Sequence, residues 1–297
     1  MKLVVISGRS GSGKSTALHA LEDQGHHCID NLPVGLLPSL MASASERAQT
    51  MPLAVSIDAR NLPEDLERFP EILETLQRSQ PELSVDVVYM DAEITTLVRR
   101  FSETRRRHPL TDDATHLREA LEAESELLQG IANLADLTLD TTSMTLHVLR
   151  SEIRARVAER GARGASVMVR SFGFRGGVPL DADMVFDVRC LPNPHWHPDL
   201  RDLTGRDAPV IEWLEQQDEV QRMYEDIHAF LTRWLPSFER NNRSYLTIAI
   251  GCTGGQHRSV YLADRLGRAL GGSAGNALVR HRELGTPVED AVADGNR

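Results

Sequence analysis

The sequence is nearly without lysine and contains little cysteine. Only Lys2 and Lys14 among the 33 basic residues are lysine, and the rest are arginine. Three cysteines, far apart in the chain, are too few for a disulfide framework or a zinc ribbon. The first apolar run, residues 3–6, is too short for a signal peptide or a membrane span, and no longer run follows it. We therefore expect a cytoplasmic protein that does not enter the membrane.

Length and charge restrict the remaining classes of protein. A chain of 297 residues is about twice the ~150 residues of a typical domain, so we expect two domains. Its 41% apolar and 26% charged residues exclude a wholly disordered or fibrous chain. A net charge of −10 disfavours indiscriminate binding of nucleic acid. Residues 150–175 nevertheless carry seven arginines against two glutamates, which form either a solvated helix face or a surface for an anionic partner.

Short apolar runs alternate with helical patterns through the first half of the chain. This alternation predicts an α/β domain with a mostly parallel sheet and helices on both faces. We expect the domain to span residues 1–160, with residues 161–164 as a linker. The expected strands are residues 3–7, 53–58, 85–91 and 137–140, and the expected helices are residues 15–24, 62–78, 93–104, 116–131 and 145–160.

A second α/β domain is expected over residues 161–297. Its expected strands are residues 166–174, 184–190 and 245–251. Helical patterns fill residues 210–230 and 258–270, and we find no internal repeat or low-complexity tract.

Residues 8–15 match the phosphate-loop pattern G-x-x-x-x-G-K-[ST] at every position. Glycines allow backbone amides to surround phosphate oxygens, and the start of the following helix adds partial positive charge. Lys14 supplies a compact ammonium for the β- and γ-phosphates, and the Ser15 hydroxyl can complete the shell of Mg²⁺. A chance match is expected in about one in a thousand such sequences. The pattern predicts a nucleotide-binding site at Gly8, Arg9, Ser10, Gly11, Ser12, Gly13, Lys14 and Ser15.

Two predicted strands end in aspartate, from which a carboxylate can organise Mg²⁺ through water. These residues are Asp58 and Asp91, and the sequence does not decide between them; a helix cap or a turn is the alternative for each. The catalytic candidates are therefore Lys14, Ser15, Asp58 and Asp91. Residues 105–109, RRRHP, stand where a nucleoside-kinase-like fold carries an arginine lid, although an RNA-facing cluster or a solvated turn fits equally well.

A second glycine-containing loop follows the predicted strand 245–251. From Cys252 to Ser259 it has the spacing C-x5-R-[ST] of the phosphate loop of cysteine phosphatases, in which a low-pKa cysteine attacks the phosphoryl group. No general acid can be placed on a facing loop, so we prefer binding without turnover to hydrolysis, and a structural turn is a third reading. The rigid loop before it, residues 192–197, can aim His195 at a ligand, although a lone histidine is more often structural.

Taken together, these motifs resemble those of the RapZ/YvcJ family of bacterial nucleotide-binding proteins. The matching stretches occur in the family's order over nearly the whole chain, at residues 8–16, 30–33, 58–61, 106–110, 171–175, 191–196 and 251–259.

The resemblance implies hydrolysis of ATP and GTP at the first loop, with the guanine nucleotide held at Asp58, Ala59, Arg60 and Asn61. No motif for an acceptor substrate stands out in the sequence, so we expect slow, regulatory turnover. The resemblance also implies that the second domain senses glucosamine-6-phosphate through His195, Thr253, Gly254, His257 and Arg258. The best-studied branch presents a small regulatory RNA to an endoribonuclease and so controls glucosamine-6-phosphate synthase. We expect such an adaptor here, as a homo-oligomer.

One feature departs from the family pattern. The RNA-binding branch ends in a cluster of lysines and arginines, whereas residues 283–297 carry four acidic residues and one arginine. Residues 105–107 or 150–175 are the alternative basic surfaces for RNA. A small-molecule kinase and a cysteine phosphatase are the alternative functions.

Overall fold

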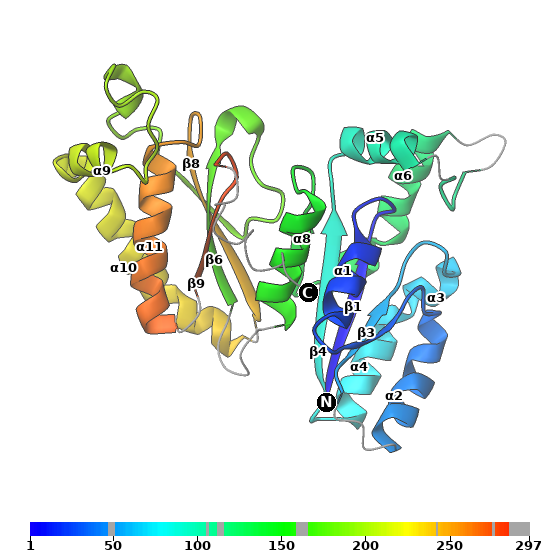
Figure 1. Cartoon of the computed structure of the whole chain (residues 1–297). Coiled ribbons are helices and arrows are strands. Elements are labelled where there is room, and N and C mark those ends of the chain that lie inside the picture. Colours follow the sequence, from blue (N-terminus) through cyan, green and yellow to red (C-terminus); the bar gives the residue numbers. More distant parts are fainter. Residues whose placement is uncertain are drawn as a thin grey trace, which may run out of the picture. The chain divides into compact units, whose positions relative to one another are not determined.

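The computed structural model describes residues 1–46, 51–104, 107–111, 116–158, 166–241, 243–274 and 277–284 (Figure 1). The chain divides into two compact units, Met1–Arg160 and Gly161–Arg297. Each unit is built on a parallel sheet of its own, so the predicted α/β class is confirmed. None of the helices among these residues is long and apolar enough to cross a membrane.

The sheet of the first unit has the strand order β2-β3-β1-β4-β5, and all its pairings are parallel. Its central strand, β1, is buried from Leu3 onward, because β3 and β4 flank it in the sheet and helices cover it. The strands are β1 (Lys2–Gly8), β2 (His27–Ile29), β3 (Leu53–Ser56), β4 (Ser84–Asp91) and β5 (Leu137–Asp140).

Helices cover both faces of this sheet. One face packs against α2, α4 and α7 through a single apolar cluster, while α1 contacts β1 and β3 and packs with α8 (Figure 1). The helices of the unit are α1 (Lys14–Glu22), α2 (Leu37–Glu46), α3 (Pro63–Glu67), α4 (Phe69–Ser79), α5 (Ile94–Thr104), α6 (Leu117–Leu127), α7 (Gln129–Ala132) and α8 (Leu146–Ile153).

In the first unit, the predicted helices 62–78 and 116–131 are each divided in two. The predicted helix 62–78 breaks at Arg68, where α3 ends and α4 begins. Pro70 follows at once, and a residue without an N–H fits only the first turn of a helix. The predicted helix 116–131 likewise divides at Leu128 into α6 and α7.

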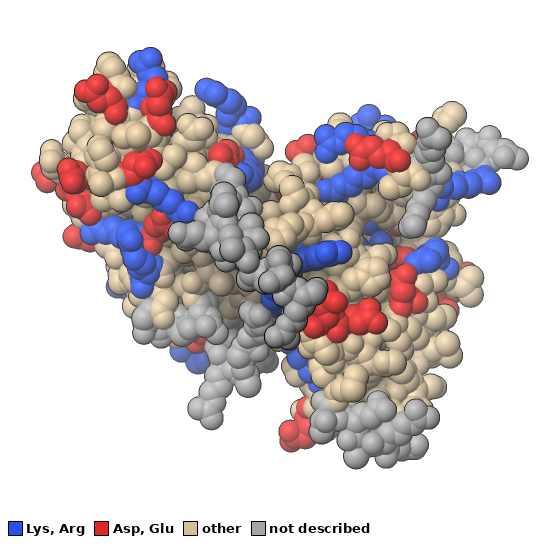
Figure 2. Space-filling model, in the orientation of Figure 1, with Lys and Arg blue, Asp and Glu red and all other residues tan. Residues whose placement is uncertain are grey.

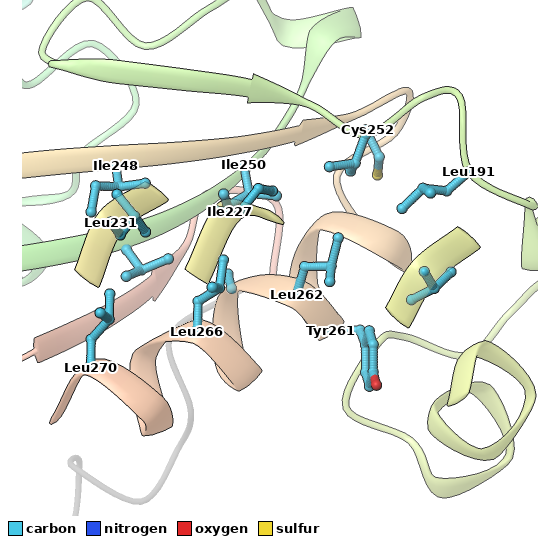
Figure 3. Close-up of a cluster of buried hydrophobic side chains, with 14 of the residues drawn as sticks. Leu191, Ile227, Leu231, Ile248, Ile250, Cys252, Tyr261, Leu262, Leu266 and Leu270 are labelled. Atoms are coloured by element: carbon cyan, nitrogen blue, oxygen red, sulfur yellow. The ribbon is translucent and has the colours of Figure 1, made fainter. Parts of the chain in front are cut away.

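The second unit has a four-stranded parallel sheet in the order β7-β8-β6-β9. Its strands are β6 (Ser166–Gly173), β7 (Met184–Asp187), β8 (Tyr245–Cys252) and β9 (Ala277–His281). Its helices are α9 (Ala208–Glu215), α10 (Asp218–Arg240) and α11 (Arg258–Ala274). The sequence predicts a single helix over residues 210–230, but the structure has two helices there, α9 and α10. The core shown in Figure 3 includes Ile227 and Leu231 of α10, Ile248 and Ile250 of β8, and Leu262 and Leu266 of α11.

Candidate functional site

A tight glycine-rich loop joins β1 to α1. Three of its glycines have positive φ angles, 136° at Gly8, 85° at Gly11 and 105° at Gly13. A Cβ atom at Gly8 would lie 2.0 Å from the carbonyl oxygen of Met90 on β4, so a side chain cannot be accommodated there. The loop therefore lies directly on the neighbouring strand and leads into the N-terminus of α1, which is the arrangement of a phosphate loop.

Lys14 is held by the loop itself. Its Nζ donates hydrogen bonds to the carbonyl oxygens of Gly8, at 2.6 Å, and Arg9, at 3.2 Å. Burial lowers the pKa of Lys14, although the charges of Glu124 and Asp58 favour its ammonium form. Charged phosphate oxygens accept hydrogen bonds more strongly than peptide carbonyls do, so a bound phosphate can replace these carbonyls as the acceptor of the Lys14 hydrogen bonds.

Two residues outside the motif donate hydrogen bonds to backbone carbonyls of the loop. Arg100 on α5 donates from Nη1 to the carbonyl of Gly11 at 3.0 Å, and Thr141, after β5, donates to the carbonyl of Ser12 at 3.0 Å. Because the C=O and N–H of one peptide group point in opposite directions, the N–H of Gly13 lies on the other side of the loop. The Ser12 hydroxyl is buried without a hydrogen-bond partner, as expected for a group that a ligand can engage.

Asp58 follows β3, on one side of β1. Its carboxylate accepts hydrogen bonds from Arg60, including one of 2.6 Å between Nη2 and Oδ2. Burial opposes its ionisation, but the Arg60 bonds and the charge of Lys14 outweigh burial and hold the pKa of Asp58 below its ordinary value. The ionised carboxylate of Asp58 and the exposed hydroxyl of Ser15 are oxygen donors of the kind that Mg²⁺ prefers.

Asp91, the other aspartate candidate, ends β4 on the opposite side of β1. Its Oδ1 accepts from Arg9 Nε at 2.6 Å and from the backbone N–H of Ala92 at 2.7 Å. Arg9 also donates to the carbonyl of Ala92. Asp91 thus fixes an arginine of the loop, whereas Asp58 lies within electrostatic reach of Lys14.

The other residues of the predicted guanine-nucleotide stretch differ in their contacts and exposure. Asn61 accepts from the backbone N–H of Val34 at 2.8 Å, and Ala59 is buried. Arg60 is partly exposed, with its Nη2 3.9 Å from Oδ1 of Asp30. Of the predicted arginine lid, residues 105 and 106 lie outside the described part of the chain, and Arg107 is exposed.

The second loop joins β8 to α11. Gly255 has a φ of 73°, and a Cβ atom at Gly173, on β6, would lie 2.7 Å from the backbone carbon of Gly254. The loop therefore rests on the end of β6, while Thr253 and Gly254 are exposed. Cys252 is only 3% exposed, and its Sγ lies 3.1 Å from Oγ of Ser259.

Arg258 joins this loop to the segment after β7. Its Nη1 donates to the carbonyls of Arg189, at 2.9 Å, and Leu191, at 2.8 Å, and its Nη2 lies 3.4 Å from Oγ1 of Thr253. The side chain is 4% exposed, and its Nε is buried without a hydrogen-bond partner. A guanidinium with a spare donor beside backbone amides is typical of an oxyanion site.

Two histidines lie at the edge of the second loop. His257 has its Nε2 3.1 Å from the carbonyl of Leu200, and burial lowers its pKa, which favours the neutral ring. His195 is exposed, and its ring centroid lies 6.3 Å from that of His257. All five residues that the resemblance assigns to the sugar phosphate therefore lie at one loop or beside it.

Of the arginines in residues 150–175, those at positions 160 and 163 lie outside the described part of the chain, and two of the others are buried. Arg156 is fully buried, and Arg170 is buried in an ion pair with Asp181 at 2.8 Å. Lys and Arg side chains are interspersed with Asp and Glu on the face shown in Figure 2. Arg282 is also engaged, because it donates to the carbonyls of Gly173 and Gly177.

The first loop and its parallel sheet define a phosphate-loop nucleotide-binding protein with a second α/β domain. Residues 1–161 match the RapZ-like N-terminal domain, and residues 165–285 match the RapZ C-terminal domain. The chain belongs to the RapZ family, as its motifs predicted.

The comparisons also found named relatives and solved structures that are similar to this chain. A nucleotide-binding protein of Pseudomonas fluorescens (strain Pf0-1) is 56% identical over 96% of this chain and 100% of its own length. A nucleotide-binding protein of Stutzerimonas stutzeri (strain A1501) is 54% identical, with the same coverage. A sugar kinase from Janibacter sp. HTCC2649 is similar in structure, with a TM-score of 0.36 and 18% identity over 52% of this chain and 92% of its own.

Proposed function

We propose that this protein binds ATP and GTP with Mg²⁺ at the first loop and hydrolyses them slowly. The observation that carries the proposal is the buried Lys14 ammonium. Within the described part of the chain, it donates hydrogen bonds to the loop carbonyls of Gly8 and Arg9 and to no other group. Mg²⁺, when bound with the nucleotide, neutralises charge on the phosphate oxygens. Lys14 would hold the β- and γ-phosphates, Ser15 and Asp58 would hold the ion, and Asp91 would fix Arg9.

Calorimetric titration with Mg-ATP and with Mg-GTP tests this site. Lys14→Ala is expected to abolish binding of both nucleotides, because it removes the ammonium that is proposed to contact the β- and γ-phosphates. Arg118→Ala, which removes an exposed charge on α6, is the control and is expected to bind as the wild type does. An unchanged ATP affinity in Lys14→Ala would contradict the assignment.

We further propose that the second unit binds glucosamine-6-phosphate without turnover, through His195, Thr253, Gly254, His257 and Arg258. The spare Nε of Arg258 and the open space around Gly254 support an anion site there. The family supports an adaptor role in the cytoplasm, in which a homo-oligomer presents a small RNA to an endoribonuclease and so tunes glucosamine-6-phosphate synthase. The two functions divide between domains 1–160 and 161–297. Sequencing of RNA that co-purifies from cells, with and without the sugar phosphate, tests the adaptor role.

Cysteine-phosphatase chemistry is disfavoured at the second loop. A phosphatase needs a protonated carboxyl as its general acid. Asp187, at the end of β7, lies within electrostatic reach of Arg258, but hydrogen bonds from Arg189 and the charge of Arg258 hold its pKa below its ordinary value, so it favours the ionised form. Cys252 packs in the apolar core of the unit, as Figure 3 shows.

A small-molecule kinase is the second candidate function, and Asp30 and Arg60 favour it. Their side chains are 54% and 46% exposed and lie beside the ionised Asp58. Such a pair can hold a hydroxyl and an anionic group of an acceptor near the phosphates. Incubation with γ-labelled ATP and a metabolite extract separates the candidates: label in inorganic phosphate alone supports hydrolysis, and label in a small molecule supports the kinase.

A further inference from the structure

A buried carboxylate on α6 accepts two hydrogen bonds from the first loop. Glu124 of α6 is fully buried, and the phosphate-loop motif does not include it. Its Oε2 accepts the backbone N–H of Ser10 at 2.8 Å, and its Oε1 accepts the hydroxyl of Ser10 at 2.7 Å. Both polar groups of one loop residue are therefore held by the two oxygens of a single side chain.

His108 completes the hydrogen bonding of this carboxylate. Its Nε2 lies 3.0 Å from Oε2 of Glu124, and its Nδ1 accepts the backbone N–H of Leu110 at 3.1 Å. Because Nδ1 accepts, the ring proton is on Nε2, which donates to Glu124. The side chain of His108 is fully buried, and its ring centroid lies 5.3 Å from that of Phe101 on α5.

The carboxylate is ionised in this arrangement. Burial opposes ionisation, but the bond from His108, the charge of Lys14 and the bonds from Ser10 together hold the pKa of Glu124 below its ordinary value. Three donors directed at one buried anion fix it in a single position. A glycine-rich loop is costly to order, so a fixed anchor lowers the entropy that ligand binding would otherwise lose.

We propose that Glu124, oriented by His108, is a positioning residue that keeps the first loop in its phosphate-binding shape. The inference rests on the proposed nucleotide binding and deepens it. The effect acts on the loop and not on the base, so it is the same for any polyphosphate ligand.

Glu124→Gln tests the proposal most directly. The glutamine keeps the size of the side chain, and it can still accept from the Ser10 N–H and from His108 while its NH₂ group donates to the Ser10 hydroxyl. It removes the negative charge, so the charge-assisted hydrogen bonds become neutral ones, which are roughly half as strong. We expect affinities for Mg-ATP, Mg-GTP and inorganic pyrophosphate to weaken together by about tenfold, with an unchanged ATP-to-GTP ratio. Glu126→Gln, the same change at an exposed position of α6, is expected to bind all three as the wild type does.

Variants of His108 and Ser10 separate positioning from a general loss of packing. His108→Gln retains an N–H donor at the place of Nε2 and is expected to bind nearly as the wild type does, whereas His108→Leu is expected to match Glu124→Gln. Ser10→Ala removes only the hydroxyl bond. If Glu124 acts through Ser10, the loss of affinity in the double variant Glu124→Gln/Ser10→Ala is smaller than the sum of the two single losses, because both changes weaken the same hydrogen bond.

Three outcomes would overturn the inference. Wild-type affinity in Glu124→Gln is one, and weaker ATP binding with unchanged pyrophosphate binding is another. Equal affinities in His108→Gln and His108→Leu are the third, and this pair decides if Glu124→Gln does not fold. A wild-type protein that binds neither nucleotide nor pyrophosphate would instead overturn the proposed function itself, and the inference with it.

Discussion

Arg258 bonds several groups of the second loop and its neighbouring segment at once, which a lysine ammonium could not do. One nitrogen of its guanidinium bonds two carbonyl oxygens, another reaches Thr253, and Nε is left over. A lysine ammonium carries the same charge but is a single point that cannot span these partners. The residue therefore both shapes the second loop and supplies it with a donor for an anion.

The substitution Arg258→Lys is expected to weaken binding of glucosamine-6-phosphate by about tenfold or more, although the charge is kept. The carbonyls of Arg189 and Leu191 would lose their shared donor, so we also expect a lower unfolding temperature of the second unit. Calorimetric titration and thermal unfolding measure the two effects. Arg240→Lys, at the exposed end of α10, is the control. Equal affinities of Arg258→Lys and the wild type would show that charge alone is sufficient.

At the scale of elements, the first loop depends on how closely β1 approaches β4. Gly8 pairs with Met90 in the sheet, and any Cβ atom there meets backbone atoms, which cannot turn aside as a side chain can. The positive φ of Gly8 adds a conformational cost for other residues.

Gly8→Ala is therefore expected to destabilise the first unit by about 2–5 kcal/mol and to abolish nucleotide binding. Gly25→Ala is the matched control, because Gly25 also has a positive φ, 84°, but has no atom within 4 Å of an added Cβ. The control is expected to lose only about 1–2 kcal/mol and to bind nucleotide normally. Chemical denaturation and titration with Mg-ATP check both variants, and equal losses of stability would show that the contact with Met90 is unimportant.

The sequence predicts a structural feature well when the residues that form it are neighbours in the chain. The first loop is a run of neighbouring residues, so its pattern was enough to predict it. Arg100, Glu124 and Thr141 support that loop from positions about 90 to 130 residues away in sequence, and no spacing rule connects them to it. The edge strands β2 and β9 were missed because they are short and only partly buried, so their hydrophobic pattern is weak.

Burial also changes what a cluster of charges means. The arginines of residues 150–175 are one basic tract in sequence, but Arg156 lies inside the first unit and Arg170 inside the second. Composition counts their charges, and only the fold shows which of them reach the surface.

At the scale of the whole molecule, each unit has a sheet and an apolar core of its own, and each carries one of the two loops. Units with separate cores can unfold separately, and a ligand stabilises the unit that binds it. We expect calorimetry to show two unfolding transitions. Mg-ATP should raise the midpoint of one, by an amount that grows with ligand concentration, and glucosamine-6-phosphate should raise the other.

The variant Lys14→Ala assigns the transitions. It should remove the shift caused by Mg-ATP and keep the shift caused by glucosamine-6-phosphate, because its only altered group lies in the first loop. Arg258→Lys should keep the shift caused by Mg-ATP and reduce the shift caused by glucosamine-6-phosphate. A single transition that both ligands raise in the wild type, and that loses both responses in Lys14→Ala, would mean that the two units unfold as one and that their sites are energetically coupled.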